Sequence, residues 1–154
     1  MAVTNQRVVG WKLVKGSFNS KLFSEFMSTL QTDQRDVVLL DNLSSHKTPE
    51  AMDTMIGRGL TPCFLPPYTP EFQPIEHCFS VVKNAFRRTP GALDFQNLMA
   101  RDRGERRSKR NREALLELAT ADVARRVEQC LVHLTPEILT NQFRVCWGRA
   151  KTAA

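Results

Sequence analysis

The chain has 154 residues, enough for one domain with a substantial buried core, or for a core with a short appendage. Its hydrophobic content of 42% and charged content of 25% are ordinary for a globular protein. No apolar run approaches the roughly 18 residues that span a membrane, and the first residues do not form a signal peptide. The formal charge of +6 favours nucleic acid as a partner, although solubility alone also explains it. We therefore expect a nuclear or cytoplasmic protein that is not secreted.

The four cysteines predict a reduced intracellular protein. Cys63, Cys78, Cys130 and Cys146 lie in or beside apolar stretches and include no CxxC pair. This pattern is typical of core cysteines. A zinc site from Cys63, His77 and Cys78 is the alternative, but the spacing fits no common ligand pattern.

The N-terminal part predicts a strand followed by a helix. Residues 7–15 alternate as a strand does, and a turn at residues 5–6 precedes them. After a loop, residues 20–30 have the spacing of an amphipathic helix that packs against a sheet. Its apolar stripe consists of Leu22, Phe23, Phe26 and Leu30.

The next segment predicts a second strand, a helix and a third strand. Residues 36–40 are uniformly apolar after Asp36, which indicates a strand buried on both faces. Thr48 and Pro49 begin a short helix that Gly57 and Gly59 stop, and residues 60–65 form one more short strand. This alternation indicates an α/β fold with at least one parallel pair of strands.

The C-terminal half predicts helices separated by a basic run. Prolines between residues 66 and 70 predict an extended loop, and Pro74 begins a helix. Residues 101–112 hold seven basic and two acidic residues, which indicates a solvated linker or, alternatively, a phosphate-binding or nuclear-import segment. Two packing helices follow, with a dimer surface as another possible role. Their apolar stripes are Val123, Val127, Cys130, Leu131 and Leu134, and Leu139, Phe143, Cys146 and Trp147.

Two acids stand out among these elements. Asp41 closes an apolar strand, Glu76 lies in the first turn of a helix, and 34 residues separate them. Carboxylates fixed on rigid elements suit Mg²⁺, which prefers oxygen ligands and supports phosphodiester chemistry. Each acid also has an ordinary role on its own: Asp41 as a turn cap and Glu76 as a favourable helix start.

Several neighbours of the acids are candidates for supporting roles. His46 and His77 either orient a ligand, contact phosphate or satisfy local backbone groups. Asn42 either holds Asp41 in place or forms a turn.

Farther along, two basic and two aromatic residues are candidates for DNA contacts. Lys83 and Arg87 follow Glu76 at helical spacing, so they either contact a DNA backbone or form a solvated face. Tyr68 and Phe72 either stack on unpaired bases or pack beneath the proline-rich loop.

Three blocks of the sequence resemble a known family. The residues around Asp41 to His46, the run from Pro66 to His77 and the interval between the acids resemble the mariner-type DDE transposases, also called the DDE superfamily endonuclease domain. Residues 16–19 are similar to the same domain farther upstream, and the resemblance covers roughly residues 2–87. It implies a ribonuclease-H-like fold, DNA as substrate, and two Mg²⁺ or Mn²⁺ ions held by two aspartates and one glutamate.

The resemblance assigns two of these three metal ligands. Asp41 matches the second aspartate and Glu76 the glutamate, whereas no acid precedes Glu25 to match the first. We therefore expect a core incomplete at its N-terminus in residues 1–87, a basic linker in residues 88–112 and a helical extension in residues 113–154. The expected function is metal-dependent DNA cleavage and strand transfer by a truncated or inactive copy. The alternative is a non-catalytic nucleic-acid-binding protein derived from a transposase.

Overall fold

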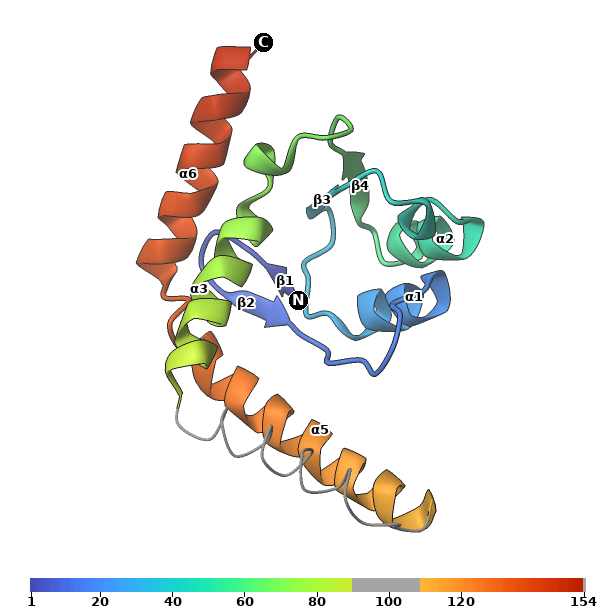
Figure 1. The fold of residues 1–154 in the computed structure, drawn as a ribbon. Coiled ribbons are helices and arrows are strands. Elements are labelled where there is room, and N and C mark those ends of the chain that lie inside the picture. The colour runs from blue at the N-terminus through green and yellow to red at the C-terminus, as the bar shows by residue number, and fades with distance from the viewer. Residues whose placement is uncertain (90–108, 154) are drawn as a thin grey trace. The chain divides into compact units, whose positions relative to one another are not determined.

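The structure, a computed structural model, describes residues 1–89 and 109–153 and is mixed α/β (Figure 1). These residues form two compact units. The larger unit combines Met1–Cys78 with Thr135–Ala154, and the smaller unit is Phe79–Leu134. The elements are β1 (Ala2–Val3), β2 (Val8–Gly10), α1 (Ser20–Thr29), β3 (Val37–Leu40), η1 (Ser44–His46), α2 (Pro49–Gly57), β4 (Thr61–Phe64), η2 (Pro70–Phe72), α3 (Pro74–Arg88), α5 (Lys109–Leu131) and α6 (Pro136–Ala153).

The chain begins with an antiparallel hairpin of β1 and β2. The Thr4 backbone N–H donates to the carbonyl of Arg7 at 2.8 Å, and the Thr4 hydroxyl accepts from the N–H of Gln6 and of Arg7. This confirms the predicted turn. The predicted strand over residues 7–15 is too long, because its ladder partner β1 has only two residues.

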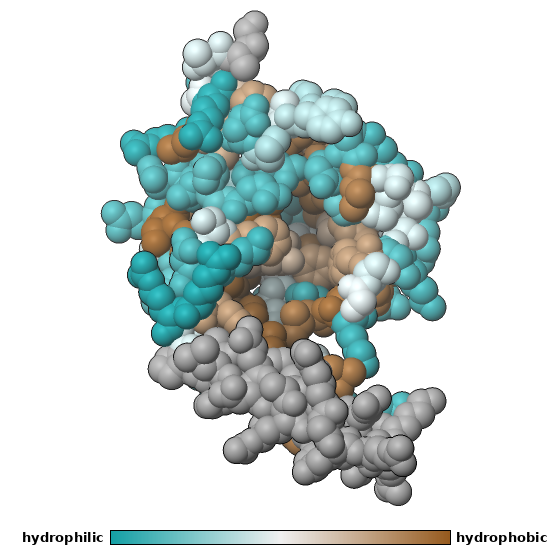
Figure 2. All heavy atoms as spheres, in the orientation of Figure 1, coloured by the Kyte–Doolittle hydropathy of each residue, from teal (hydrophilic) through white to brown (hydrophobic). Residues whose placement is uncertain are grey.

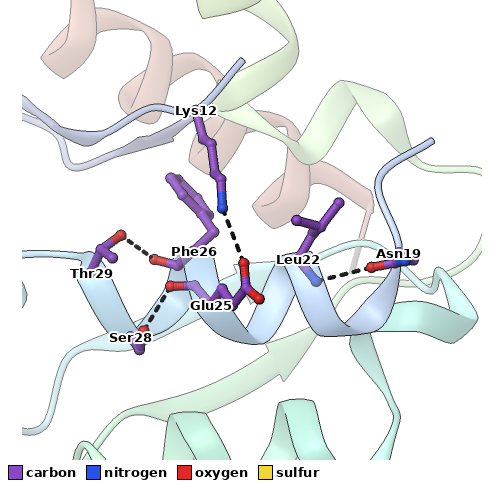
Figure 3. A network of polar contacts seen from close by, with 7 residues as sticks. All are labelled: Lys12, Asn19, Leu22, Glu25, Phe26, Ser28 and Thr29. Atoms are coloured by element: carbon purple, nitrogen blue, oxygen red, sulfur yellow. Dashed lines mark hydrogen bonds and ion pairs between the residues drawn. The ribbon is translucent and has the colours of Figure 1, made fainter. Parts of the chain in front are cut away.

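Helix α1 begins directly after Asn19, which caps it. The Asn19 side chain accepts a hydrogen bond from the Leu22 N–H at 3.0 Å, which satisfies one free donor of the first turn (Figure 3). Lys12 Nζ lies 3.3 Å from Glu25 Oε2, so an exposed ion pair joins the segment after β2 to α1. Phe23 and Phe26 of the predicted stripe are buried.

Strands β3 and β4 form the predicted parallel pair, with α2 as their connection. Their register runs from Val37 opposite Thr61 to Leu40 opposite Phe64. The Thr48 hydroxyl caps α2 by accepting from an N–H of the first turn. Parallel strands end at the same edge of their sheet, so the residues after both strands are brought together there.

The main core lies where α1 and α2 cover one face of this pair. Its buried residues are Phe23, Phe26, Met27, Leu30, Leu40, Ala51, Met55 and Leu60. The prediction of a strand buried on both faces is wrong, because Val37 and Leu39 are 61% and 45% exposed. The helices cover only the face to which Val38 and Leu40 point. For the same reason Cys63 of β4 is exposed, although it was expected in the core.

In its described residues, the smaller unit contains the part of α3 from Phe79 onward and all of α5. Cys130 and Leu134 are buried here, as the predicted stripe requires. Arg126 is also buried, and its guanidinium carbon lies 4.3 Å from the Phe86 ring centre. Helix α5 begins at Lys109, inside the segment predicted as a basic linker. Most of that basic run, residues 101–108, lies outside the described residues.

Helix α6 packs into the larger unit. Leu139 and Cys146 are buried, the Thr140 hydroxyl donates to the Asn5 carbonyl at 2.8 Å, and η2 packs against the helix. Trp147 was expected in the same apolar stripe, but its side chain is 67% exposed. Consecutive helical residues differ by about 100° around the axis, so Trp147 turns away from the face that buries Cys146.

Candidate functional site

Asp41 follows β3 at the carboxyl edge of the parallel pair. Its Oδ1 accepts a hydrogen bond from the Leu43 N–H at 3.2 Å, so it makes the turn that is its ordinary role. The side chain is about half exposed. No described residue donates a hydrogen bond to Oδ2, so the turn leaves one carboxylate oxygen available to a ligand.

His46 lies against Asp41. Its Nδ1 is 2.8 Å from Asp41 Oδ1, and its ring packs on Phe23 with the ring centres 4.3 Å apart. The two polar atoms are not aligned for a hydrogen bond, so the contact is an ion pair when the imidazole is protonated. The predicted phosphate contact of His46 stays a prediction. The structure places the imidazole beside the Asp41 carboxylate without a hydrogen bond between them.

Asn42 and Lys47 connect the ends of the two strands. Asn42 Nδ2 donates to the Leu65 carbonyl at 2.5 Å, and Lys47 Nζ donates to Asn42 Oδ1. The same ammonium lies 5.1 Å from the Phe64 ring centre. Asn42 thus clamps the segment after β3 to the segment after β4. Sequence reasoning missed Lys47; the available signal was a lone basic residue shortly after a strand-end acid.

Glu76 lies in the first turn of α3, as predicted. The carboxylate is exposed, and the free N–H groups of a helix start stabilise a negative charge there. Lys83 and Arg87 are exposed on the same helix, and Lys83 Nζ lies 5.8 Å from the Phe79 ring centre. His77, next to Glu76, is half-buried.

Tyr68 of the proline-rich loop is almost fully exposed to solvent. Its side chain is 99% exposed and its backbone has φ of 60°, a conformation uncommon for a side-chain-bearing residue. The Thr69 hydroxyl donates to the Pro66 carbonyl at 2.6 Å and closes the turn. The alternative that the rings of Tyr68 and Phe72 pack beneath the loop is therefore wrong for Tyr68. Phe72 is half-buried.

Asp41 and Glu76 belong to the same compact unit, and together they offer hard oxygen donors. Exposed carboxylates of this kind fit Mg²⁺ or Mn²⁺ and do not select a softer metal. Within residues 1–89 and 109–153, no three or more His, Cys, Asp or Glu side chains are grouped to hold a metal ion. Among the described residues, Asp41 and Glu76 are thus not part of a larger group of ligand-type side chains.

Cys78 and Cys146 are buried core residues, as the sequence predicts. Burial, together with the nearby Cys146, raises the pKa of the Cys78 thiol to about 11. Burial also raises the pKa of the Cys146 thiol.

A family model described as DDE superfamily endonuclease matches residues 1–99, which include both acids. The chain belongs to the DDE superfamily endonucleases. Enzymes of this superfamily generally use divalent metal ions and act on DNA, and the mixed α/β architecture is consistent with a DDE nuclease domain. No curated protein and no solved structure matches the chain significantly. None of the described helices of this DDE domain is long and apolar enough to cross a membrane.

Proposed function

We propose that the chain is a mariner-type DDE transposase domain with a ribonuclease-H-like core, in which Asp41 and Glu76 hold one divalent cation. The main support is the position of Asp41, at the carboxyl edge of a parallel strand pair with one oxygen free. The segment after β4 leads through the proline-rich loop to Glu76, and Asn42 clamps its beginning to the Asp41 turn. The family match covers this whole arrangement.

When bound, the ion would polarise a phosphodiester and activate a water molecule for attack. The residues of the chain prepare the site for this. The Leu43 N–H orients the Asp41 carboxylate, and His46 lies against the same carboxylate oxygen. The first turn of α3 favours the negative charge of Glu76. Lys47, held by Asn42, adds a positive charge at the same sheet edge, where it suits a phosphate group.

Two members of the family's triad have counterparts among residues 1–154, Asp41 for the second aspartate and Glu76 for the glutamate. Two carboxylates by themselves hold a small divalent cation weakly, because such an ion takes six ligands and keeps several water molecules.

The second candidate function is DNA binding without cleavage. The formal charge of +6 and the exposed Lys83 and Arg87 favour it, because cationic side chains on a surface attract phosphates in any sequence context. Such a protein needs neither carboxylate.

Plasmid nicking in Mg²⁺ or Mn²⁺ distinguishes the two functions. For a metal-dependent nuclease, Asp41→Asn and Glu76→Gln each lower the nicking rate by more than the roughly 10- to 100-fold that loss of an outer-shell partner costs. Asp53→Asn removes an exposed carboxylate from α2 of the same unit and should leave the rate unchanged. For a pure binding protein, all four proteins bind DNA alike in a salt-sensitive manner and none nicks it. Nicking by Asp41→Asn at the unsubstituted rate would contradict the proposed metal site.

A further inference from the structure

The outward face of α6 combines an aromatic side chain with basic ones. The helix is anchored by Leu139 and Cys146, which are 0% and 3% exposed. After Glu137 it contains no acid. Hydrophilic side chains dominate the surface over α6, on the left in Figure 2. The outward residues are Arg144, Trp147, Gly148, Arg149 and Lys151, all of them exposed.

Trp147 is an unusual residue to leave in water. Its side chain is 67% exposed, and the Lys151 Nζ lies 5.9 Å from its ring centre. Tryptophan carries a large apolar surface and is buried on average, so covering this ring with a partner would remove apolar area from water. The flat ring with a cation beside it suits a planar, electron-rich group attached to an anion.

A shallow surface region on α6, largely open to solvent, is lined by Arg144, Val145, Gly148, Arg149 and Thr152. A Cβ atom added at Gly148 would meet no heavy atom within 4 Å, so the surface is open at this residue. Arg144 Nη2 donates to Asn141 Oδ1 at 2.8 Å, which fixes its guanidinium. Among the described residues no carboxylate pairs with these arginines or with Lys151.

We propose that this face of α6 binds single-stranded DNA. Trp147 stacks on an unpaired base, and Arg144 and Lys151, which lie beside it at helical spacing, pair with the adjacent phosphates. Arg149 lies farther round the helix and pairs with a phosphate farther along the strand. The cations select a polyanion, and the exposed ring selects bases that are not already stacked and paired in a duplex.

The position of α6 links this surface to the acids. Helix α6 packs against η2, and η2 directly precedes the helix that carries Glu76. A strand held on α6 is therefore bound by the same compact unit as the carboxylates. The inference rests on the proposed function only for the identity of the nucleic acid as DNA, since the binding itself needs no metal ion.

Binding of a labelled oligothymidylate, measured by fluorescence anisotropy in EDTA, tests the basic part of the surface. The oligomer should have roughly 20 nucleotides, more than one such surface covers. The triple variant Arg144→Ala, Arg149→Ala and Lys151→Ala should reduce the salt slope of binding by about 2, because each single-strand phosphate contact contributes about 0.7. The matched control Arg7→Ala, Lys15→Ala and Lys21→Ala removes the same charge from exposed residues of the same unit and should leave the slope unchanged.

Two measurements test the role of Trp147. Trp147→Ala should weaken single-strand binding about 5- to 100-fold without changing the salt slope, and Trp147→Phe should restore most of the affinity. In the variant Trp11→Phe, Trp147 is the remaining tryptophan of the two in the chain, and its fluorescence should fall when the oligonucleotide binds.

These outcomes separate this surface from the metal site. Asp41→Asn should bind the oligonucleotide in EDTA as the unsubstituted protein does, so a failed metal site leaves this result intact. The inference is overturned if the basic triple variant and its control bind alike, if duplex of the same length binds more tightly than the single strand, or if the fluorescence of Trp147 does not respond. Retained circular dichroism and thermal midpoint confirm that each variant is folded.

Discussion

Replacing Met55 with alanine is expected to lower the free energy of unfolding by about 2–5 kcal/mol, the range for large-to-small changes in a core. Met55 is 0% exposed and lies in the cluster between α1, α2 and the parallel strands. Alanine removes the apolar side chain and leaves a cavity that the surrounding residues fill only in part. Denaturation by urea, followed by circular dichroism, gives the change.

The neighbouring Ile56 provides the control. It is an apolar residue of the same helix, but its side chain is 59% exposed. Ile56→Ala should change the free energy of unfolding by no more than about 0.5 kcal/mol. Equal effects of the two substitutions would mean that the cluster around Met55 is not the core of the larger unit.

Arg58→Ala is expected to lower the free energy of unfolding by about 1.5–3 kcal/mol, the range for hydrogen bonds to a charged group. The guanidinium of Arg58 reaches from the end of α2 to the end of α1. Nη1 donates to the Ser28 carbonyl at 2.7 Å, and Nη2 donates to the Leu30 carbonyl at 2.5 Å. The last carbonyls of a helix have no partner within the helix, and a cation there also offsets the negative end of the helix dipole.

Lysine at position 58 tests the geometry of this contact. Arg58→Lys keeps the charge but cannot place two donors on two carbonyls, so it should recover only part of the lost stability. Arg7→Ala, at an exposed position of the hairpin turn, is the control and should leave the free energy of unfolding nearly unchanged. Hydrogen exchange at the end of α1 should become faster in Arg58→Ala. Unchanged exchange and unchanged stability would show that the carbonyls are satisfied in another way.

The elements that local signals predict are the ones the structure confirms. Asn19 caps α1 and Thr48 caps α2, each through a hydrogen bond to a backbone N–H three residues on, and Pro74 is the first residue of α3. A cap depends only on neighbouring backbone groups, so its sequence signal is reliable. The parallel pairing of β3 and β4 follows in the same way from the short helix between them.

Exposure was harder to predict, because it depends on how many elements pack together. Val37 and Leu39 are apolar in a strand, but one face of the pair stays uncovered by the helices. Trp147 lies beside a buried cysteine in sequence and yet points outward. In both cases the residue type indicates burial, and the number and placement of neighbouring elements decide against it.

The sequence predicts on which elements Asp41 and Glu76 lie, but not the contacts of the residues around Asp41. Asp41 lies at the end of a strand, as the apolar run predicts, and Glu76 lies at a helix start. The contacts of His46 with Asp41 and of Lys47 with Asn42 depend on how the η1 turn folds, which the residue types alone do not specify. The convergence of both acids on one ion stays a prediction, because the proline-rich loop sets the path between them.

A crystal structure of the protein grown with Mn²⁺ tests this convergence directly, through the anomalous signal of the metal. Oxygens of Asp41 and Glu76 should both lie about 2.1 Å from a single manganese ion, the spacing typical of small divalent cations with oxygen ligands. An ion bound elsewhere, or two carboxylates too far apart to reach the same ion, would contradict the proposed site.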